Sequence, residues 1–292
     1  MEIIVAKNSG LCYGVRRALD IAGETRQKKA GKVLTLGDLI HNPQVIADLE
    51  RQRIHSINDL DGLNQATVII RSHGVSPDIY ELLAQKNIEI VDATCPIVKK
   101  IQKLVEVLAK DKEEIIIVGN KEHPEIKGLI GFSRGKGIIV ENEDQVKSLP
   151  NRKKRAVLAQ STQDLYLFEK IVAALIEKTK ELKVYNTICR STQTRQKSTS
   201  ELASYVDTLF IVGGKSSSNT NKLYQISKRI LPNTYFIESA TQIKTEMLKG
   251  AKKIGLSGGA STPPRAIQEA VAKIKSSFKH QFHREKTVQC QR

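Results

Sequence analysis

Residues 114–125 read Glu-Ile-Ile-Ile-Val-Gly-Asn-Lys-Glu-His-Pro-Glu: an apolar run, a glycine, and a polar loop that ends in His123, Pro124 and Glu125. An apolar run without polar alternation is typical of a parallel strand that is covered on both faces. Proline is favoured in the first turn of a helix. We therefore predict a strand at 114–118, a helix that begins at Pro124, and a polar loop at the carboxyl end of the strand.

The same order of elements recurs along the chain, and such internal repetition decides the fold. Strands that alternate with helices indicate βαβ units, parallel sheets and an α/β protein. We predict three similar α/β lobes at 13–95, 96–190 and 191–278, with residues 1–12 joining the third lobe and a polar tail at 279–292. The other predicted strands lie at 1–6, 33–36, 67–71, 88–91, 156–159, 184–187, 208–212 and 253–257.

Three of the four cysteines, Cys12, Cys95 and Cys189, lie in equivalent loops, so folding could bring their thiols to one point. No cysteine is part of a Cys-x-x-Cys pair, and four in 292 residues do not form a disulfide scaffold. Three-point ligation of zinc, with a histidine added, or of an iron–sulfur cluster is indicated. A four-iron cluster held by three cysteines would leave one iron open to act as a Lewis acid. Cys290 lies in the tail and is interpreted as incidental.

Other loops carry groups that suit a phosphorylated ligand. The pairs Gly213-Gly214 and Gly258-Gly259 precede hydroxyl-rich stretches at 216–221 and 261–262, and such loops donate hydrogen bonds to phosphate oxygens. Neither loop is a Walker A sequence, which disfavours nucleotide hydrolysis. The imidazoles of His41 and His73 lie in matching loops and suit a diphosphate.

Glu125 is the one carboxylate in a converging loop and is therefore the candidate acid or base. An equally simple interpretation is a first-turn glutamate that complements the helix dipole. His55 lies outside any equivalent loop and is interpreted as a surface residue, and Ser76 is interpreted as a helix cap.

Charge and composition restrict the partners. The chain has 47 Lys and Arg residues against 31 Asp and Glu residues, a net charge of +16, which first suggests nucleic acid. Only 4% of the residues are aromatic and none is tryptophan, so platforms for base stacking are scarce. We interpret the basic run 152–155 as a solvated hairpin tip. No apolar run approaches the roughly 20 residues of a membrane span, and residues 1–6 do not resemble an export signal, so we expect a cytoplasmic protein.

Several motifs together resemble the LytB family of 4-hydroxy-3-methylbut-2-enyl diphosphate reductases, which catalyse the final step of the methylerythritol phosphate isoprenoid pathway. The resemblance runs from residue 1 to about residue 275 in consistent order. It implies a pseudo-threefold cloverleaf of three lobes around one [4Fe-4S] cluster per chain. The motifs are Leu11-Cys12-Tyr13-Gly14-Val15, His41-Asn42, Ser72-His73-Gly74-Val75, Asp92-Ala93-Thr94-Cys95-Pro96, His123-Pro124-Glu125, Ser217-Ser218-Asn219 and Gly259-Ala260-Ser261.

The resemblance also implies residue roles. Cys12, Cys95 and Cys189 would ligate three irons, and the apical iron, without a protein ligand, would bind the allylic hydroxyl. Glu125 would deliver protons, with Ser161 oriented at the same oxygen; the family usually has threonine at this position, so the hydroxyl is retained and the methyl lost. The residues implied in diphosphate binding are His41, His73, His123, Ser217, Ser218, Asn219 and Ser261.

The expected reaction consumes two electrons and two protons, releases the hydroxyl as water, and gives isopentenyl and dimethylallyl diphosphates. A ferredoxin or flavodoxin is the expected electron donor, because the basic surface suits an acidic partner. Two alternatives are a cluster-dependent lyase such as quinolinate synthase, which needs no net reduction, and a zinc-stabilised nucleic-acid binder. We expect no nucleic acid and no membrane as partners.

Overall fold

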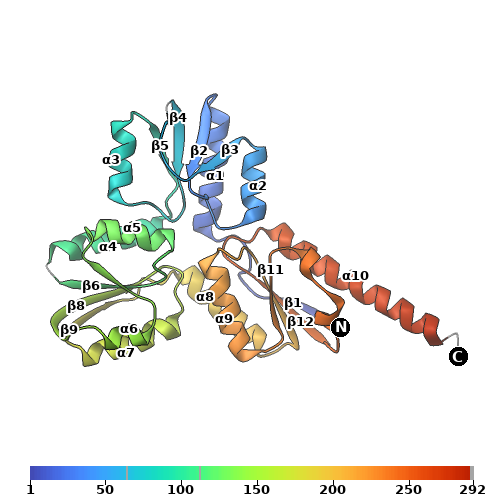
Figure 1. The fold of residues 1–292 in the computed structure, drawn as a ribbon. Helices are drawn as coiled ribbons and strands as arrows, with labels where there is room; N and C mark the ends of the chain where they lie inside the picture. The colour runs from blue at the N-terminus through green and yellow to red at the C-terminus, as the bar shows by residue number, and fades with distance from the viewer. Residues whose placement is uncertain (64, 112, 290–292) are drawn as a thin grey trace. The chain divides into compact units, whose positions relative to one another are not determined.

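The computed structural model describes residues 1–63, 65–111 and 113–289, with side chains described as far as residue 277. Its strands form three four-stranded sheets within these residues (Figure 1). The first sheet holds β2 (Lys32–Leu36), β3 (Ile54–Ile57), β4 (Ala66–Ile70) and β5 (Glu89–Asp92), and the second holds β6 (Glu114–Val118), β7 (Gly137–Val140), β8 (Arg152–Ala159) and β9 (Thr179–Tyr185). The third holds β10 (Thr208–Val212), β11 (Thr234–Ile237), β12 (Lys253–Gly258) and β1 (Glu2–Val5).

The three sheets share one topology. Their strand orders are β3-β2-β4-β5, β7-β6-β8-β9 and β11-β10-β12-β1, and every neighbouring pair is parallel. When the strands of each sheet are numbered in chain order, their spatial order is 2-1-3-4 in all three sheets. In the third sheet, β1 from the start of the chain occupies the position of the fourth strand. The predicted repetition of α/β units, with the N-terminal strand completing the third, is confirmed.

The helices cover both faces of each sheet because the inner strands are apolar on both faces. All five residues of β4 and of β10 are buried, as expected for doubly covered parallel strands. On the second sheet, α4 and α5 pack on one face and α6 and α7 on the other (Figure 1). The helices are α1 (Tyr13–Lys28), α2 (Pro43–Arg51), α3 (Pro77–Gln85), α4 (Pro96–Lys110), α5 (Pro124–Phe132), α6 (Glu143–Lys147), α7 (Leu165–Glu177), α8 (Arg190–Ala203), α9 (Ser218–Ile230) and α10 (Pro264–Gln289), with 3₁₀ turns η1 (Ala240–Gln242) and η2 (Thr245–Leu248).

Proline marks the start of five helices, and the predicted helix start at Pro124 is confirmed. The helices α2, α3, α4 and α5 each begin at a proline that follows a strand, and α10 begins at Pro264. The missing N–H of proline costs nothing in the first turn, where no intrahelical partner exists. The polar residues before these prolines thus lie at helix N-termini, at the carboxyl ends of the strands.

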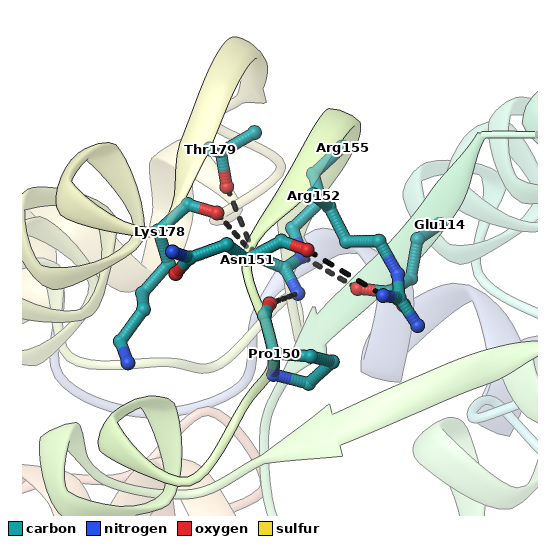
Figure 2. A network of polar contacts seen from close by, with 7 residues as sticks. All are labelled: Glu114, Pro150, Asn151, Arg152, Arg155, Lys178 and Thr179. Carbon is teal, nitrogen blue, oxygen red and sulfur yellow. Dashed lines mark hydrogen bonds and ion pairs between the residues drawn. The ribbon is translucent and has the colours of Figure 1, made fainter.

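The interpretation of residues 152–155 as a solvated hairpin tip is wrong. They form the first half of β8, and the side chain of Arg155 is fully buried. Figure 2 shows its guanidinium, which forms an ion pair with Glu114 and donates to the carbonyls of Pro150 and Lys178. A buried charge is tolerated when ion pairs and hydrogen bonds compensate it, and this arginine has both.

The chain divides into two compact units, one formed by Cys12–Gln193 and the other by Met1–Leu11 with the residues from Thr194 onwards. The tail predicted at 279–292 continues as helix α10 as far as Gln289, and Cys290 lies outside the described residues. Among the helices of the described part of the chain, none has the length and hydropathy to span a bilayer.

Candidate functional site

Cys12, Cys95 and Cys189 all belong to the unit Cys12–Gln193 and are all free and partly buried. Each lies at the start of a helix: Cys12 caps α1 and accepts a 3.4 Å hydrogen bond from the N–H of Val15, while Cys95 directly precedes α4 and Cys189 directly precedes α8. Burial raises the pKa of the Cys95 thiol, and the charges of the other two cysteines act in the same direction. The structure thus places the Cys95 thiol within electrostatic reach of the other two thiols.

Helix α1 lies directly against one of these thiols. A Cβ atom at Gly14 would lie 2.5 Å from Sγ of Cys95, so only glycine fits without displacing the sulfur. The guanidinium of Arg17, one turn along α1, donates to the carbonyl of Thr94 at 3.3 Å. Three soft sulfur donors from three separate loops form a donor set that suits zinc or iron–sulfur ligation.

Three histidines form a compact cluster in the same unit. The ring centroids of His41 and His73 are 4.3 Å apart in a stacked pair, and His123 meets them edge-on at 5.4 and 5.2 Å. One ring nitrogen from each lies within 4.8 Å of the other two. The loops after β2, β4 and β6 carry these residues, so the predicted convergence of His41, His73 and His123 is observed.

Burial is the main influence on the charge of this cluster. It lowers the pKa of His41 and His73, and it lowers the pKa of His123 to about 3, with the neighbouring charges of His41 and Arg71 adding to the effect. The three imidazoles are therefore neutral at pH 7 in the unliganded protein. Nδ1 of His73 is buried without a hydrogen-bond partner among the described residues, which leaves a polar atom for a ligand.

Arg71 is a member of this cluster that the sequence analysis did not single out. Its guanidinium is close enough to lower the pKa of all three histidines. Three neutral imidazoles could hold a cation, but a fixed positive charge beside them opposes a cation and favours an anion. The signal in the sequence was its place directly after β4, two residues before His73.

Glu125 and Ser161 form a buried polar pair. Glu125 is 1% exposed, and its carboxylate accepts two 2.7 Å hydrogen bonds from Ser161, one from the backbone N–H and one from the hydroxyl. Burial raises the pKa of Glu125 despite the opposing effect of these two bonds. Such a carboxyl group holds a proton more readily than an exposed glutamate and can deliver it.

The start of α5 connects the histidine cluster to this pair. His123 is the N-cap of α5, and its Nδ1 accepts a 3.2 Å hydrogen bond from the N–H of Glu125. Because Nδ1 is the acceptor, a neutral His123 carries its proton on Nε2. A Cβ atom at Gly131 of α5 would lie 2.4 Å from Cβ of Ser76, so this glycine allows the helix to approach the loop after His73.

The remaining predicted site residues lie in the other unit. Ser217 caps α9, and its hydroxyl accepts a 3.4 Å hydrogen bond from the N–H of Thr220. Asn219 is 3% exposed, and neither atom of its side-chain amide has a partner in the described structure. Ser218 is the first residue of α9, and Ser261 is buried in the loop between β12 and α10. A buried amide without partners makes this position a candidate for contact with a polar ligand.

Two other residues have the roles that the sequence analysis gave them. His55 is exposed on β3, as expected of a surface residue. Ser76 occupies the N-cap position of α3 as predicted, although its hydroxyl makes no capping hydrogen bond.

Comparison with known proteins gives consistent matches over nearly the whole chain. The family model described as LytB protein matches residues 3–275. The 4-hydroxy-3-methylbut-2-enyl diphosphate reductase of Caldanaerobacter subterraneus is 45% identical over 280 residues, which are 94% of this chain and 97% of that protein. The reductase of the same name from Aquifex aeolicus is 40% identical over 277 residues, or 94% of this chain and 96% of the relative.

Solved structures agree with these relatives. A structure of (E)-4-hydroxy-3-methyl-but-2-enyl diphosphate reductase, named as the terminal enzyme of the non-mevalonate pathway, has 40% identity and a TM-score of 0.69 over 94% of this chain and 100% of its own. A structure of E-1-hydroxy-2-methyl-but-2-enyl-4-diphosphate reductase from Plasmodium falciparum has 30% identity and a TM-score of 0.89 over 93% of this chain and 87% of its own. With a family model that spans residues 3–275, this chain belongs to the LytB protein family.

Proposed function

We propose that this chain reduces 4-hydroxy-3-methylbut-2-enyl diphosphate to isopentenyl and dimethylallyl diphosphates. The allylic C–O bond breaks, two electrons come from a protein donor, and two protons are added, so that the hydroxyl group leaves as water. The family and the names of the relatives support this reaction. The observation that carries it for this chain is the buried, hydrogen-bonded Glu125 in the unit that also holds the three thiols.

The three cysteines fit an iron–sulfur cluster. They are free, partly buried and supplied by three loops, and Cys95 interacts electrostatically with the other two. Cys12, Cys95 and Cys189 would hold a [4Fe-4S] cluster that keeps one iron without a protein ligand, as the family resemblance implies. Once bound, the cluster supplies electrons and a Lewis acid for the hydroxyl oxygen. Zinc is the weaker alternative because it has no redox chemistry.

Glu125 acts as the proton donor. Its raised pKa favours the protonated form, and its two hydrogen bonds from Ser161 fix the orientation of the carboxyl group. The hydroxyl of Ser161 both donates to Glu125 and can accept a proton-relay hydrogen bond, because a hydroxyl has two lone pairs. Burial of the pair excludes bulk water, which would otherwise compete for the proton.

The histidine cluster is the proposed diphosphate-binding group of the unit Cys12–Gln193. His41, His73 and His123 donate from ring N–H groups, and the charge of Arg71 beside them favours a polyanion. In the other unit, the unpartnered amide of Asn219 supports the diphosphate-binding role that the family resemblance implies for this residue and for Ser217, Ser218 and Ser261.

The function is tested by measuring product formation after anaerobic cluster reconstitution, with the variant Glu125→Gln beside Glu122→Gln. Glu122 lies three residues away, is exposed and pairs with Lys127, so E122Q is a matched control for loss of one carboxylate. We expect E125Q to bind substrate and retain iron but lose about 10²-fold or more in turnover, and E122Q to be unchanged. Near-normal turnover of E125Q would remove Glu125 from the mechanism. Conversion of substrate without electron consumption would indicate a lyase instead.

A further inference from the structure

A surface pocket of about 280 Å³ reaches one of the proposed cluster ligands from outside. Helix α4 forms one wall, and the loop that connects β9 to α8 forms the other, so that Cys189 itself lines the pocket. The pocket lies entirely within the unit Cys12–Gln193. Neither the proton donor Glu125 nor the three histidines line it, so it is separate from the residues assigned to substrate.

The pocket combines an apolar floor with a basic rim. Ile97, Ile101 and Leu104 follow one another on one face of α4, at the spacing of successive helical turns, and Ile188 faces them from the loop. Lys100, on the same face of α4, and Arg190, next to Cys189, are both exposed. An apolar centre with a charged rim is the usual composition of a protein–protein interface.

Helix α4, which forms one wall of this pocket, carries an excess of positive charge. Helix α4 carries the lysines Lys99, Lys100, Lys103 and Lys110 against the single acidic residue Glu106. The other three lysines form ion pairs with Asp92 or Glu106, whereas Lys100 makes no ion pair within the described residues. The whole chain carries a net charge of +16. Complementary charge steers a partner to such a patch and raises its rate of association.

We propose that this pocket is the docking site of an acidic one-electron carrier protein. The inference rests on the proposed function, because it takes Cys189 to be a cluster ligand. The carrier is oxidised by one electron in each encounter and the cluster is reduced by one, so two encounters supply the two electrons of a turnover. A carrier that docks here would lie against Cys189, the proposed ligand of the cluster that accepts its electron. It would not obstruct the residues assigned to substrate. Weak, transient interfaces of small area are typical of electron-transfer pairs.

The test is stopped-flow reduction of the reconstituted cluster by an acidic flavodoxin in its fully reduced form. The variant Lys100→Glu is compared with Lys153→Glu, which makes the same change in net charge. Lys153 is also exposed but lies near the amino end of β8, whereas the pocket lies beyond the carboxyl end of β9. Dithionite, a small reductant that needs no docking surface, serves as the second control. Iron per chain is measured for every variant.

We expect K100E to lower the second-order rate with flavodoxin about fivefold at low ionic strength, and this difference to disappear at about 0.5 M salt, where the Debye length is only a few ångströms. K153E should remain within about 1.5-fold of the parent, because its distance from the pocket weakens any effect on docking. Dithionite should reduce all three proteins at the same rate. Equal effects of K100E and K153E, or none, would overturn the docking site while leaving the reductase function intact. Failure of the parent protein to take up iron would instead overturn the proposed function.

Discussion

Replacement of Arg155 by methionine should strongly destabilise the second sheet. Arg155 joins three segments at the amino end of that sheet: its guanidinium pairs with Glu114 of β6 and donates to the carbonyls of Pro150 at 2.6 Å and Lys178 at 3.0 Å (Figure 2). Methionine fills much of the same volume but makes none of these bonds. The substitution therefore removes a buried charge and leaves two carbonyl groups without this donor.

The expected loss in the free energy of unfolding depends on the groups that lose Arg155 as a partner. Breaking a buried ion pair by removal of one partner costs about 3–5 kcal/mol, mainly because the remaining groups lose compensation. Glu114 keeps one partner, since Arg152 Nε lies 3.1 Å from its other oxygen, so the lower half of that range applies and we expect about 3–4 kcal/mol. Replacing Arg152 by methionine removes an ion pair from the same carboxylate, but the Arg152 side chain is 49% exposed. We expect that change to cost about 0.5 kcal/mol.

Urea unfolding, together with hydrogen exchange of the backbone amides in β8 and β9, measures this difference. In R155M the amides of these two strands should exchange much faster than in R152M, while those in β10 and β12, which belong to the other unit, should keep their protection. If R155M lowered the free energy of unfolding by less than about 1 kcal/mol, or if the two variants lowered it equally, the argument that burial makes the Arg155 ion pair important for stability would be refuted.

Two other predictions concern the site. Because the pKa of each of the three clustered histidines is lowered in the free protein, a bound polyanion should raise it, so calorimetric titration with inorganic pyrophosphate at pH 7 should show proton uptake. Replacing His41 by asparagine should weaken this binding about tenfold or more and reduce the uptake, and unchanged binding would contradict the assignment. Replacing Cys12, Cys95 or Cys189 by serine should remove most of the iron and acid-labile sulfide of the reconstituted protein. The control Cys290→Ser should retain about four irons and four sulfides per chain. Uptake of zinc without iron by the parent protein would contradict the proposal of an iron–sulfur cluster.

The inner strands could be predicted from the sequence because burial on both faces requires a continuous run of apolar residues. The runs at 114–118 and 208–212 are strands with the predicted bounds, and both are almost wholly buried. The edge strands β3, β7 and β11 were not predicted. Each is four residues long, follows the first strand of its sheet and is only partly buried, and only three consecutive apolar residues in β7 and in β11 and none in β3 mark it in the sequence. Pairing with the preceding strand creates these edges, and pairing over such distances has no local signal.

The predicted positions of the site residues depended on a topological argument rather than on local patterns. Parallel strands of one repeated topology bring their carboxyl ends to one edge, where loops that are distant in sequence meet. This argument placed His41, His73 and His123 together, and the structure has them in ring contact. It could not indicate Arg155, because a cluster of four basic residues normally lies in solvent. Glu114 on the neighbouring strand, together with the two carbonyls that accept from Arg155, makes burial of that charge possible.

The charge of the histidine cluster shows most clearly what sequence alone does not give. Taken as residue types, three histidines suggest imidazolium groups ready for a diphosphate, but burial keeps them neutral until a ligand arrives. In the free protein the positive charge at this place therefore comes from Arg71, and under the proposed function additional charge would develop when phosphate oxygens stabilise protonated rings. Three permanent charges packed at 4.3 to 5.4 Å would repel one another and destabilise the fold. If the cluster binds the diphosphate as proposed, neutral imidazoles that take up protons together with the substrate would avoid that cost, and release of the product would restore the neutral cluster.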